Sequence, residues 1–205
     1  MLRVGLTGSI GVGKSFVTGV LAELGCHVLD ADRTARAVVE KGAPGLNAVI
    51  KAFGENILRE DGSLNRQKLA DIIFTDENQR ELLNSILHPF IIATQDEQMQ
   101  RWGKDDPDGI AVIDAALMIE SGGYRRFDKL IVVYCRPEIQ LQRVMSRTGL
   151  SDEDALQRIN AQMSQDDKKK FADYLIDTSE GIEAARKQTE EVYERLVQDN
   201  IKNNS

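Results

Sequence analysis

The chain has 205 residues, of which 41 % are hydrophobic and 29 % are charged, and its formal net charge is −7. This length and composition are typical of one sizeable soluble domain, or of one core with inserted subdomains. The negative charge, without a basic stripe, argues against nucleic acid as the main partner, and no apolar run is long enough to cross a membrane.

The two cysteines, Cys26 and Cys135, both stand beside apolar, strand-like residues. That setting favours buried, reduced thiols over a disulfide or a metal site. No signal-peptide pattern precedes the first apolar run, so we expect a cytoplasmic protein without a membrane partner. We expect it to be a monomer or a weak homo-oligomer.

Residues 8–15 match the phosphate-binding loop (P-loop) motif G-x-x-x-x-G-K-[S/T]. The apolar run before them is typical of a buried strand, and apolar residues recur after them at helical spacing. In this motif the glycines let backbone N–H groups wrap a polyphosphate, Lys14 reaches the β and γ phosphates, and the Ser15 hydroxyl binds Mg²⁺. The alternative is a glycine-rich turn between two packed elements. We predict a nucleoside-triphosphate site made of Gly8, Ser9, Ile10, Gly11, Val12, Gly13, Lys14, Ser15 and Phe16.

A second apolar run, residues 26–29, leads into Asp30-Ala31-Asp32. Ligands of parallel α/β sheets bind beyond the carboxyl ends of the strands, so both carboxylates are expected near the phosphates. We predict a catalytic or substrate-orienting role for Asp32, with Asp30 as the weaker candidate. In the alternative, one of them only caps a helix over residues 34–41.

A break at residues 42–45 is followed by a mostly helical block, residues 46–101, whose apolar stripes indicate a core. His88-Pro89 lies in its third helical stretch, and Pro89 is expected to kink or end that helix. His88 either contacts substrate or caps the kinked helix. By analogy with P-loop kinases, such an insertion holds the acceptor substrate.

The next apolar run, residues 110–114, ends in Asp114, and residues 130–134 form another buried strand. An aspartate at that place suits Mg²⁺ coordination, directly or through a water. Many strands of α/β proteins also end in Asp for capping alone, so both interpretations of Asp114 stay open.

The segment after Arg136-Pro137 has the pattern of a helical lid. Arg143 and Arg147 are four residues apart, so both can project from one side of a helix. Ser151 and Asp154 form a capping-box pattern that opens the next helix, and the charged residues 166–170 are expected to be solvated. Lid arginines would neutralise charge on a transferring phosphoryl group. A surface helix with solvent-facing arginines is the alternative.

The C-terminal part predicts a short strand at residues 174–176 and a helix over residues 182–197. Residues after Gln198 are expected to form a frayed tail.

Three classes of P-loop protein are candidates for this pattern. A GTP-binding switch needs an N/T-K-x-D segment, which the chain lacks, and Asp106–Gly109 matches D-x-x-G only as a turn. Ser121-Gly122-Gly123 alone does not indicate an ABC-type ATPase. A small-molecule kinase accounts best for the P-loop, the following acidic residue, the helical insertion and the arginine-bearing lid. A nucleotide-dependent binding module that hydrolyses ATP slowly is the alternative outside kinases.

Almost the whole chain resembles the dephospho-CoA kinase family. The resemblance is carried by the order and spacing of Leu6–Gly8 and Gly13–Ser15, Asp30–Asp32, Ala35-Arg36, Gly62–Leu64, Arg66, Leu83-Asn84, His88-Pro89, Asp114–Glu120, Tyr124–Asp128, Arg143, Arg147, Gly149–Ser151, Arg158-Ile159, Gln162 and Ala172-Asp173. The resemblance implies phosphorylation of the ribose 3′-hydroxyl of dephospho-CoA by Mg-ATP, the last step of coenzyme A synthesis. A nucleoside or nucleoside-monophosphate kinase is the second choice.

The same resemblance implies an α/β P-loop fold of three layers with a five-stranded parallel sheet. The implied divisions are a core of residues 1–32, 108–136 and 172–200, a helical CoA-binding insertion of residues 33–107 and a lid of residues 137–171. We predict the catalytic residues Asp32, Lys14, Arg143 and Arg147, the metal ligands Ser15 and Asp114, and the substrate-binding residues Asp32, Arg66, His88, Pro89, Leu117 and Glu120.

Three residues depart from the family pattern. Phe16 replaces the usual Thr, Ala116 stands where Pro is common, and Thr178 occupies a place where Asn is usual. Phe16 should matter little, because Ser15 already supplies the hydroxyl for the metal. The Thr178 departure weakens any prediction of adenine contacts near the last strand.

Overall fold

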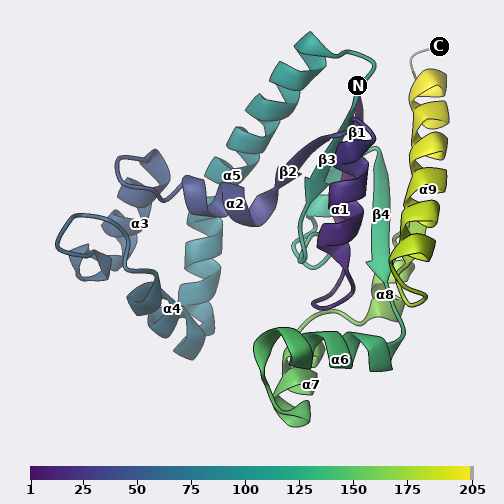
Figure 1. Cartoon of the computed structure of the whole chain (residues 1–205). Coiled ribbons are helices and arrows are strands. Elements are labelled where there is room, and N and C mark those ends of the chain that lie inside the picture. The colour runs from purple at the N-terminus through teal and green to yellow at the C-terminus, as the bar shows by residue number, and fades with distance from the viewer. Residues whose placement is uncertain (204–205) are drawn as a thin grey trace. The chain divides into compact units, whose positions relative to one another are not determined.

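The structure, a computed structural model, describes residues 1–203 except for the side chains of residues 75 and 203. Its contacts divide the chain into two compact units. The first consists of Met1–Leu29 and the chain from Trp102 onward, and the second of Asp30–Arg101. Figure 1 shows the helices and strands of both units.

A five-stranded sheet with the strand order β2-β3-β1-β4-β5 forms the centre of the first unit. Its strands are β1 (Leu2–Thr7), β2 (His27–Asp30), β3 (Ile110–Asp114), β4 (Lys129–Tyr134) and β5 (Tyr174–Asp177). β1 pairs in parallel with β3 and β4, and β4 pairs in parallel with β5. Short apolar runs buried on both faces are typical of parallel strands. The predicted parallel α/β sheet is confirmed.

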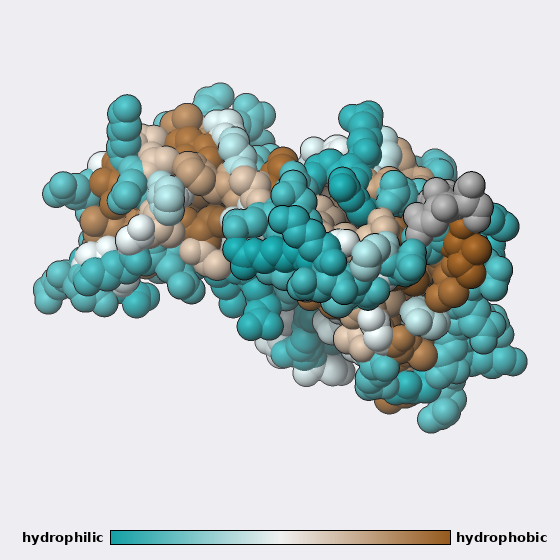
Figure 2. Space-filling view, turned by 90° about the horizontal axis from the view of Figure 1, so that it is seen from above, coloured by the Kyte–Doolittle hydropathy of each residue, from teal (hydrophilic) through white to brown (hydrophobic). Residues whose placement is uncertain are grey.

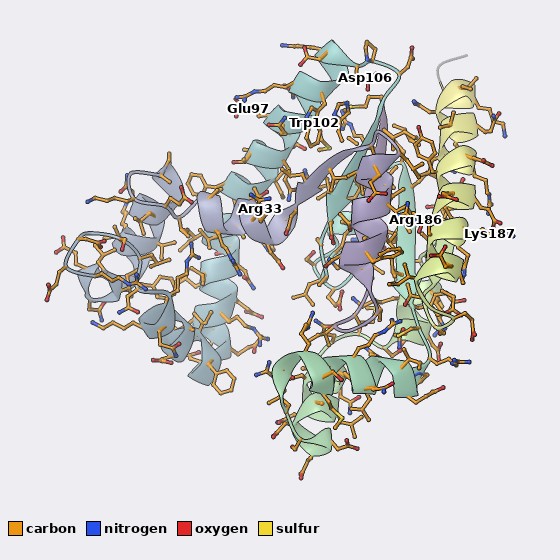
Figure 3. The ribbon with its side chains drawn as sticks, in the orientation of Figure 1. Arg33, Glu97, Trp102, Asp106, Arg186 and Lys187 are labelled. Atoms are coloured by element: carbon orange, nitrogen blue, oxygen red, sulfur yellow. The ribbon has the colours of Figure 1, made fainter. Side chains whose placement is uncertain are left out.

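Helices α1 (Lys14–Glu23) and α9 (Ile182–Asn203) pack against each other beside the sheet, as Figure 1 shows. Val17 of α1 and Leu196 of α9 share one hydrophobic core with Val4 of β1. Figure 3 shows Arg186 on α9, and its guanidinium forms an ion pair of 2.9 Å with Glu23 of α1. These two helices therefore cover the sheet face to which Val4 points.

The opposite face of β1 is covered by the segment that follows β3. Successive side chains of a strand point to opposite faces, so Gly5 lies on the other side from Val4. A Cβ on Gly5 would meet Met118 Sδ at 2.5 Å and the Phe127 ring at 3.0 Å. Glycine at this position lets the segment pack directly on the strand. A short helix, η2 (Gly123–Arg126), lies within that segment.

Helix α9 is longer than the sequence predicted. The expected frayed tail after Gln198 is wrong, because the helix continues to Asn203. Asn200 is buried, and its amide donates to the carbonyls of Asp108 and Gly109 at 2.6 and 3.3 Å. These bonds hold the last turns of α9 against the turn before β3.

The predicted lid consists of α6 (Pro137–Thr148), α7 (Asp152–Asn160) and α8 (Gln165–Lys169). Ser151 caps α7, since its hydroxyl accepts the Asp154 N–H at 3.2 Å, which confirms the predicted N-cap. The prediction that residues 166–170 are solvated is wrong for Lys168, whose side chain is fully buried. A run of three lysines does not reveal which of them points inward.

The second unit is helical. It holds α2 (Ala31–Ala37), α3 (Pro44–Phe53), η1 (Glu55–Ile57), α4 (Arg66–Thr75) and most of α5 (Glu77–Asp105), whose end belongs to the first unit. The predicted helical block is confirmed, and its apolar stripes form a separate core around Leu46, Val49 and Leu83.

Two predictions for these helices are corrected. The helix expected over residues 34–41 spans Ala31–Ala37, because the Asp30 carboxylate accepts the N–H groups of Asp32 and Arg33 at 2.7 and 3.2 Å and so starts it earlier. Of the kink or end expected at Pro89, the end is wrong, since α5 continues through it to Asp105. Proline costs one backbone hydrogen bond there, and the packing of α5 in the core offsets that cost.

Charged and polar side chains dominate the face seen in Figure 2, where hydrophobic residues form separate patches. Among residues 1–203, no helix has the length and apolar character needed to span a bilayer.

Candidate active site

The P-loop connects β1 to α1 at the carboxyl end of the sheet. Gly11 and Gly13 adopt left-handed backbone conformations with φ of 82° and 85°, which residues with a Cβ rarely reach. A Cβ on Gly8 would lie 2.5 Å from the Val133 carbonyl oxygen, so the loop can pass β4 only with glycine there. No side chain caps the first N–H groups of α1, which leaves them available to an anion.

Lys14 contacts Asp114, the last residue of the neighbouring strand β3. Its ammonium is hydrogen-bonded to Oδ1 of the Asp114 carboxylate, and the Thr18 hydroxyl lies 2.9 Å from Oδ2. Lys14 and Thr18 are four residues apart and therefore share one face of α1. Asp114 is buried, so this carboxylate holds the Lys14 side chain in a fixed place. The sequence predicted Lys14 and Asp114 separately, and sheet order brings them together.

Thr18 was not predicted as a site residue. Its position one helical turn after Lys14 was the available signal. Ser15, the predicted metal ligand, is exposed in the first turn of α1. Phe16 packs partly against the core, with the Arg186 guanidinium 5.9 Å from its ring centre.

Arg143 of α6 is held beside the P-loop by Thr178. Its Nη1 and Nη2 donate to the hydroxyl and carbonyl oxygens of Thr178, each at 2.8 Å. The Thr178 hydroxyl in turn donates to the Val12 carbonyl at 2.7 Å. A Cβ on Gly13 would lie 3.5 Å from Arg143 Nη1, so the guanidinium is next to the loop. Thr178, which the sequence marked only as a departure, is the residue that positions Arg143.

Arg147 lies one turn further along α6 and is exposed. Within the described part of the chain its side chain has no ion-pair or hydrogen-bond partner. The sequence placed Arg143 and Arg147 on the same side of a helix, and the structure gives them different surroundings. Arg143 is fixed by two hydrogen bonds, whereas Arg147 is free to meet a ligand.

Two other predicted residues follow β3. Leu117 is 52 % exposed, while Glu120 accepts hydrogen bonds from Lys168 Nζ and from the Met163 N–H. The carboxylate of Glu120 is therefore engaged within the first unit.

The second unit has a pocket of about 360 Å³ that includes two predicted site residues. Asp32 and Arg66 line it together with Arg36, above an apolar floor that includes Leu69 and Leu87. Arg66 Nη2 donates to the Arg36 carbonyl at 3.2 Å, which orders the arginine. A carboxylate and two guanidinium groups beside apolar side chains suit an amphipathic anion.

His88 and Pro89 do not line this pocket. Both are exposed on α5 in the second unit. The structure thus brings Asp32 and Arg66 together and leaves the His88-Pro89 pair apart from them.

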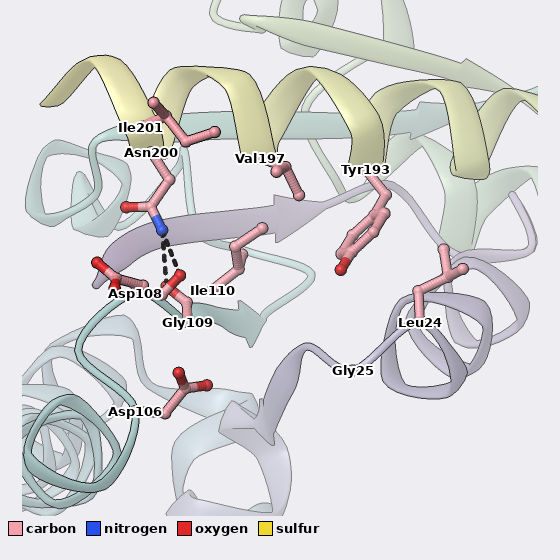
Figure 4. Close-up of a pocket in the computed structure, with 10 residues that line it drawn as sticks. All are labelled: Leu24, Gly25, Asp106, Asp108, Gly109, Ile110, Tyr193, Val197, Asn200 and Ile201. Carbon is pink, nitrogen blue, oxygen red and sulfur yellow. Dashed lines mark hydrogen bonds between the residues drawn. The ribbon is translucent and has the colours of Figure 1, made fainter. Parts of the chain in front are cut away.

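A larger pocket, of about 560 Å³, lies in the first unit, and Figure 4 shows the residues that line it. Its walls include Gly25 after α1, Ile110 at the start of β3 and Tyr193 of α9. It opens at the amino end of β3, whereas the P-loop and Asp114 lie at the carboxyl ends. Ligands of α/β sheets bind at the carboxyl ends, so this pocket is not the phosphate site despite its size.

Comparison with known proteins identifies the family. The sequence profile of dephospho-CoA kinase matches residues 2–184. The chain is 42 % identical to the dephospho-CoA kinase of Aquifex aeolicus, with 97 % of this chain and 100 % of that protein covered.

Solved structures agree with that match. TT1252 from Thermus thermophilus has a TM-score of 0.81 and 28 % identity, and the match covers 94 % of this chain and 95 % of that one. The dephospho-CoA kinase from Campylobacter jejuni has a TM-score of 0.64 and 27 % identity, with 95 % and 96 % covered. The chain therefore belongs to the dephospho-CoA kinase family, which phosphorylates dephospho-CoA with ATP in the final step of coenzyme A synthesis.

Proposed function

We propose that Lys14, Asp32, Arg143 and Arg147 carry the transfer of the γ-phosphoryl group of ATP to the ribose 3′-hydroxyl of dephospho-CoA. Phosphoryl transfer depends mainly on positioning the reactants and neutralising charge. Lys14, Arg143 and Arg147 supply that charge, and Asp32 supplies the base.

The donor side is the P-loop. Its backbone N–H groups and the start of α1 bind the phosphates, and Lys14 approaches the β and γ phosphates. The buried Asp114 supports this role, because its carboxylate holds the Lys14 side chain beside the P-loop. Arg143, which Thr178 holds beside the P-loop through a hydrogen bond, neutralises charge on the phosphates. Arg147, which is exposed, reaches the phosphates from the solvent side.

Mg²⁺ is the metal that ATP requires in such a site, and Ser15 and Asp114 are the residues that would hold it. A serine hydroxyl and an aspartate carboxylate are the hard oxygen ligands that Mg²⁺ prefers. Asp114 would hold the ion directly or through a water. When bound, the ion neutralises charge on the phosphate oxygens.

The acceptor side is the pocket of the second unit. Asp32 accepts or orients the proton of the 3′-hydroxyl, and Arg36 and Arg66 bind anionic groups of dephospho-CoA. The capping alternative for Asp32 loses its support here, because Asp30 is the residue that caps α2. His88, Pro89 and Leu117 stay predicted substrate contacts. The CoA-binding insertion (residues 33–107) and the lid (residues 137–171) stay predicted functional divisions of the chain.

We further propose a cytoplasmic location. Both cysteines are buried and free, which agrees with the predicted reduced thiols. The monomer or weak homo-oligomer stays a prediction.

The observation that carries the proposal is the contact between Lys14 of the P-loop and the buried Asp114. The test measures ADP release from Mg-ATP with dephospho-CoA, AMP, CMP, UMP or uridine as acceptor. We expect stimulation by dephospho-CoA alone, with coenzyme A as product. Stimulation by a nucleotide or by uridine instead would contradict the acceptor, and no stimulation by any of them would point to a switch or to an untested substrate.

A further inference from the structure

The segment that leads from the end of α7 into α8 contacts the P-loop. We call residues 162–168 the strap. The Ile10 N–H donates to Gln162 Oε1 at 2.8 Å, and the Ser9 hydroxyl donates to the Met163 carbonyl at 3.3 Å. The tip of the P-loop is therefore attached to the strap through one backbone and one side-chain group.

The same strap contacts the segment after β3. The Met163 N–H donates to Glu120 Oε1 at 3.2 Å. Lys168, at the other end of the strap, donates from Nζ to the Ala116 carbonyl at 2.8 Å, and its ammonium lies 2.8 Å from Glu120 Oε1 and 3.0 Å from Oε2. The Glu120 carboxylate thus accepts hydrogen bonds from residues near both ends of the strap.

Lys168 has 0 % exposure, although it stands in a run of three lysines. Removing an ammonium group from water costs several kcal/mol, and its partners must compensate for that loss. Replacing buried ion pairs with apolar residues is often neutral for stability, so such a pair is better explained by the arrangement that it specifies. What this pair specifies is the attachment of the strap to the segment after β3.

We propose that the Glu120–Lys168 ion pair positions the P-loop for ATP. Glu120 is then a positioning residue that acts through the strap and Ser9 and Ile10, and it does not contact dephospho-CoA. This inference rests on the proposed function and deepens its ATP-binding side. It also revises the predicted role of Glu120, because both of its carboxylate oxygens already accept hydrogen bonds from the strap.

The test uses Glu120→Gln, Lys168→Met and the double variant. Methionine has a length similar to that of lysine without its charge, and glutamine keeps the shape of glutamate. We expect each single variant to raise the KM for ATP about tenfold, which corresponds to about 1.4 kcal/mol, and to change the KM for dephospho-CoA less than twofold. Since the two residues act as a unit, the double variant should lose about as much as one single variant.

Lys170→Met is the matched control. Lys170 is exposed and pairs with Asp167, three residues away, at 2.6 Å, so the variant should leave both KM values within twofold. Melting temperatures of all variants show whether each is folded. If Lys168→Met does not fold, Glu120→Gln decides the question, because Glu120 is partly exposed and glutamine removes the negative charge that faces Lys168 while its single amide oxygen still accepts a hydrogen bond.

Three outcomes overturn the inference. If Glu120→Gln raises the KM for dephospho-CoA and leaves that for ATP unchanged, Glu120 contacts the acceptor. If the variants lower the melting temperature but keep both KM values, the pair is only structural. If the effects of the single variants add in the double variant, the two residues act separately.

Failure of the proposed function is separate from these outcomes, because the wild-type chain would then release no ADP with dephospho-CoA. The Kd of Mg-ATP, measured by titration of the wild type and Lys168→Met, would still test the positioning. We expect the Kd to rise about tenfold in the variant, and an unchanged Kd would overturn the inference.

Discussion

Replacing Thr178 with valine removes one buried hydroxyl and keeps the shape of the side chain. The Val12 carbonyl loses its donor at 2.7 Å, and Arg143 Nη1 loses its acceptor at 2.8 Å. A buried carbonyl without a partner costs about 1–3 kcal/mol, and a hydrogen bond to a charged group contributes about 1.5–3 kcal/mol. Arg143 keeps its second hydrogen bond, to the Thr178 carbonyl. We therefore expect a loss of about 2–4 kcal/mol in the free energy of unfolding.

For a chain of this size, such a loss lowers the melting temperature by about 5–15 °C. Because Arg143 is then less well oriented beside the P-loop, kcat/KM for ATP should fall about tenfold. Urea unfolding and steady-state kinetics measure the two effects. Thr178→Ser is the control, since it keeps the hydroxyl and should keep most of the activity. A Thr178→Val enzyme as stable and as active as the wild type would refute the role given to this hydroxyl.

Further predictions concern the chemistry and the thiols. Lys14→Ala should abolish ADP release in the presence of dephospho-CoA, because no other group replaces its charge at the phosphates, and retained turnover would remove the P-loop lysine from the mechanism. Asp32→Asn should lower kcat about 100-fold or more, whereas Asp30→Asn, which still caps α2, should change kcat little; equal effects would contradict the separate roles. Burial raises the pKa of Cys26 to about 12 and also raises the pKa of Cys135, so neither thiol should be alkylated rapidly at pH 8 in the folded protein. Mass spectrometry of iodoacetamide-treated native and urea-unfolded protein would check this, and rapid labelling of the native form would count against burial.

In the second unit the sequence predicted that helices form, but it did not predict where two of them begin or end. The helical block and the apolar stripes were predictable because helical periodicity is a local property of the sequence. The start of α2 was not, since both Asp30 and Asp32 are acceptable caps and only the backbone decides which carboxylate reaches the N–H groups. Pro89 was misjudged as a possible helix end for a similar reason, because local preference does not include the packing that keeps α5 continuous.

The sequence by itself determined the P-loop, the strand before it, the helix after it and the family, because these depend on residue type and spacing over short stretches. The contact between Lys14 and Asp114 was decided by the tertiary structure, since strand order makes β1 and β3 neighbours although about a hundred residues separate them. The same holds for Thr178 beside Arg143 and for the buried Lys168. A hydroxyl or an ammonium has the same local pattern whether it faces water or a partner, and only the packing of distant segments supplies the partner.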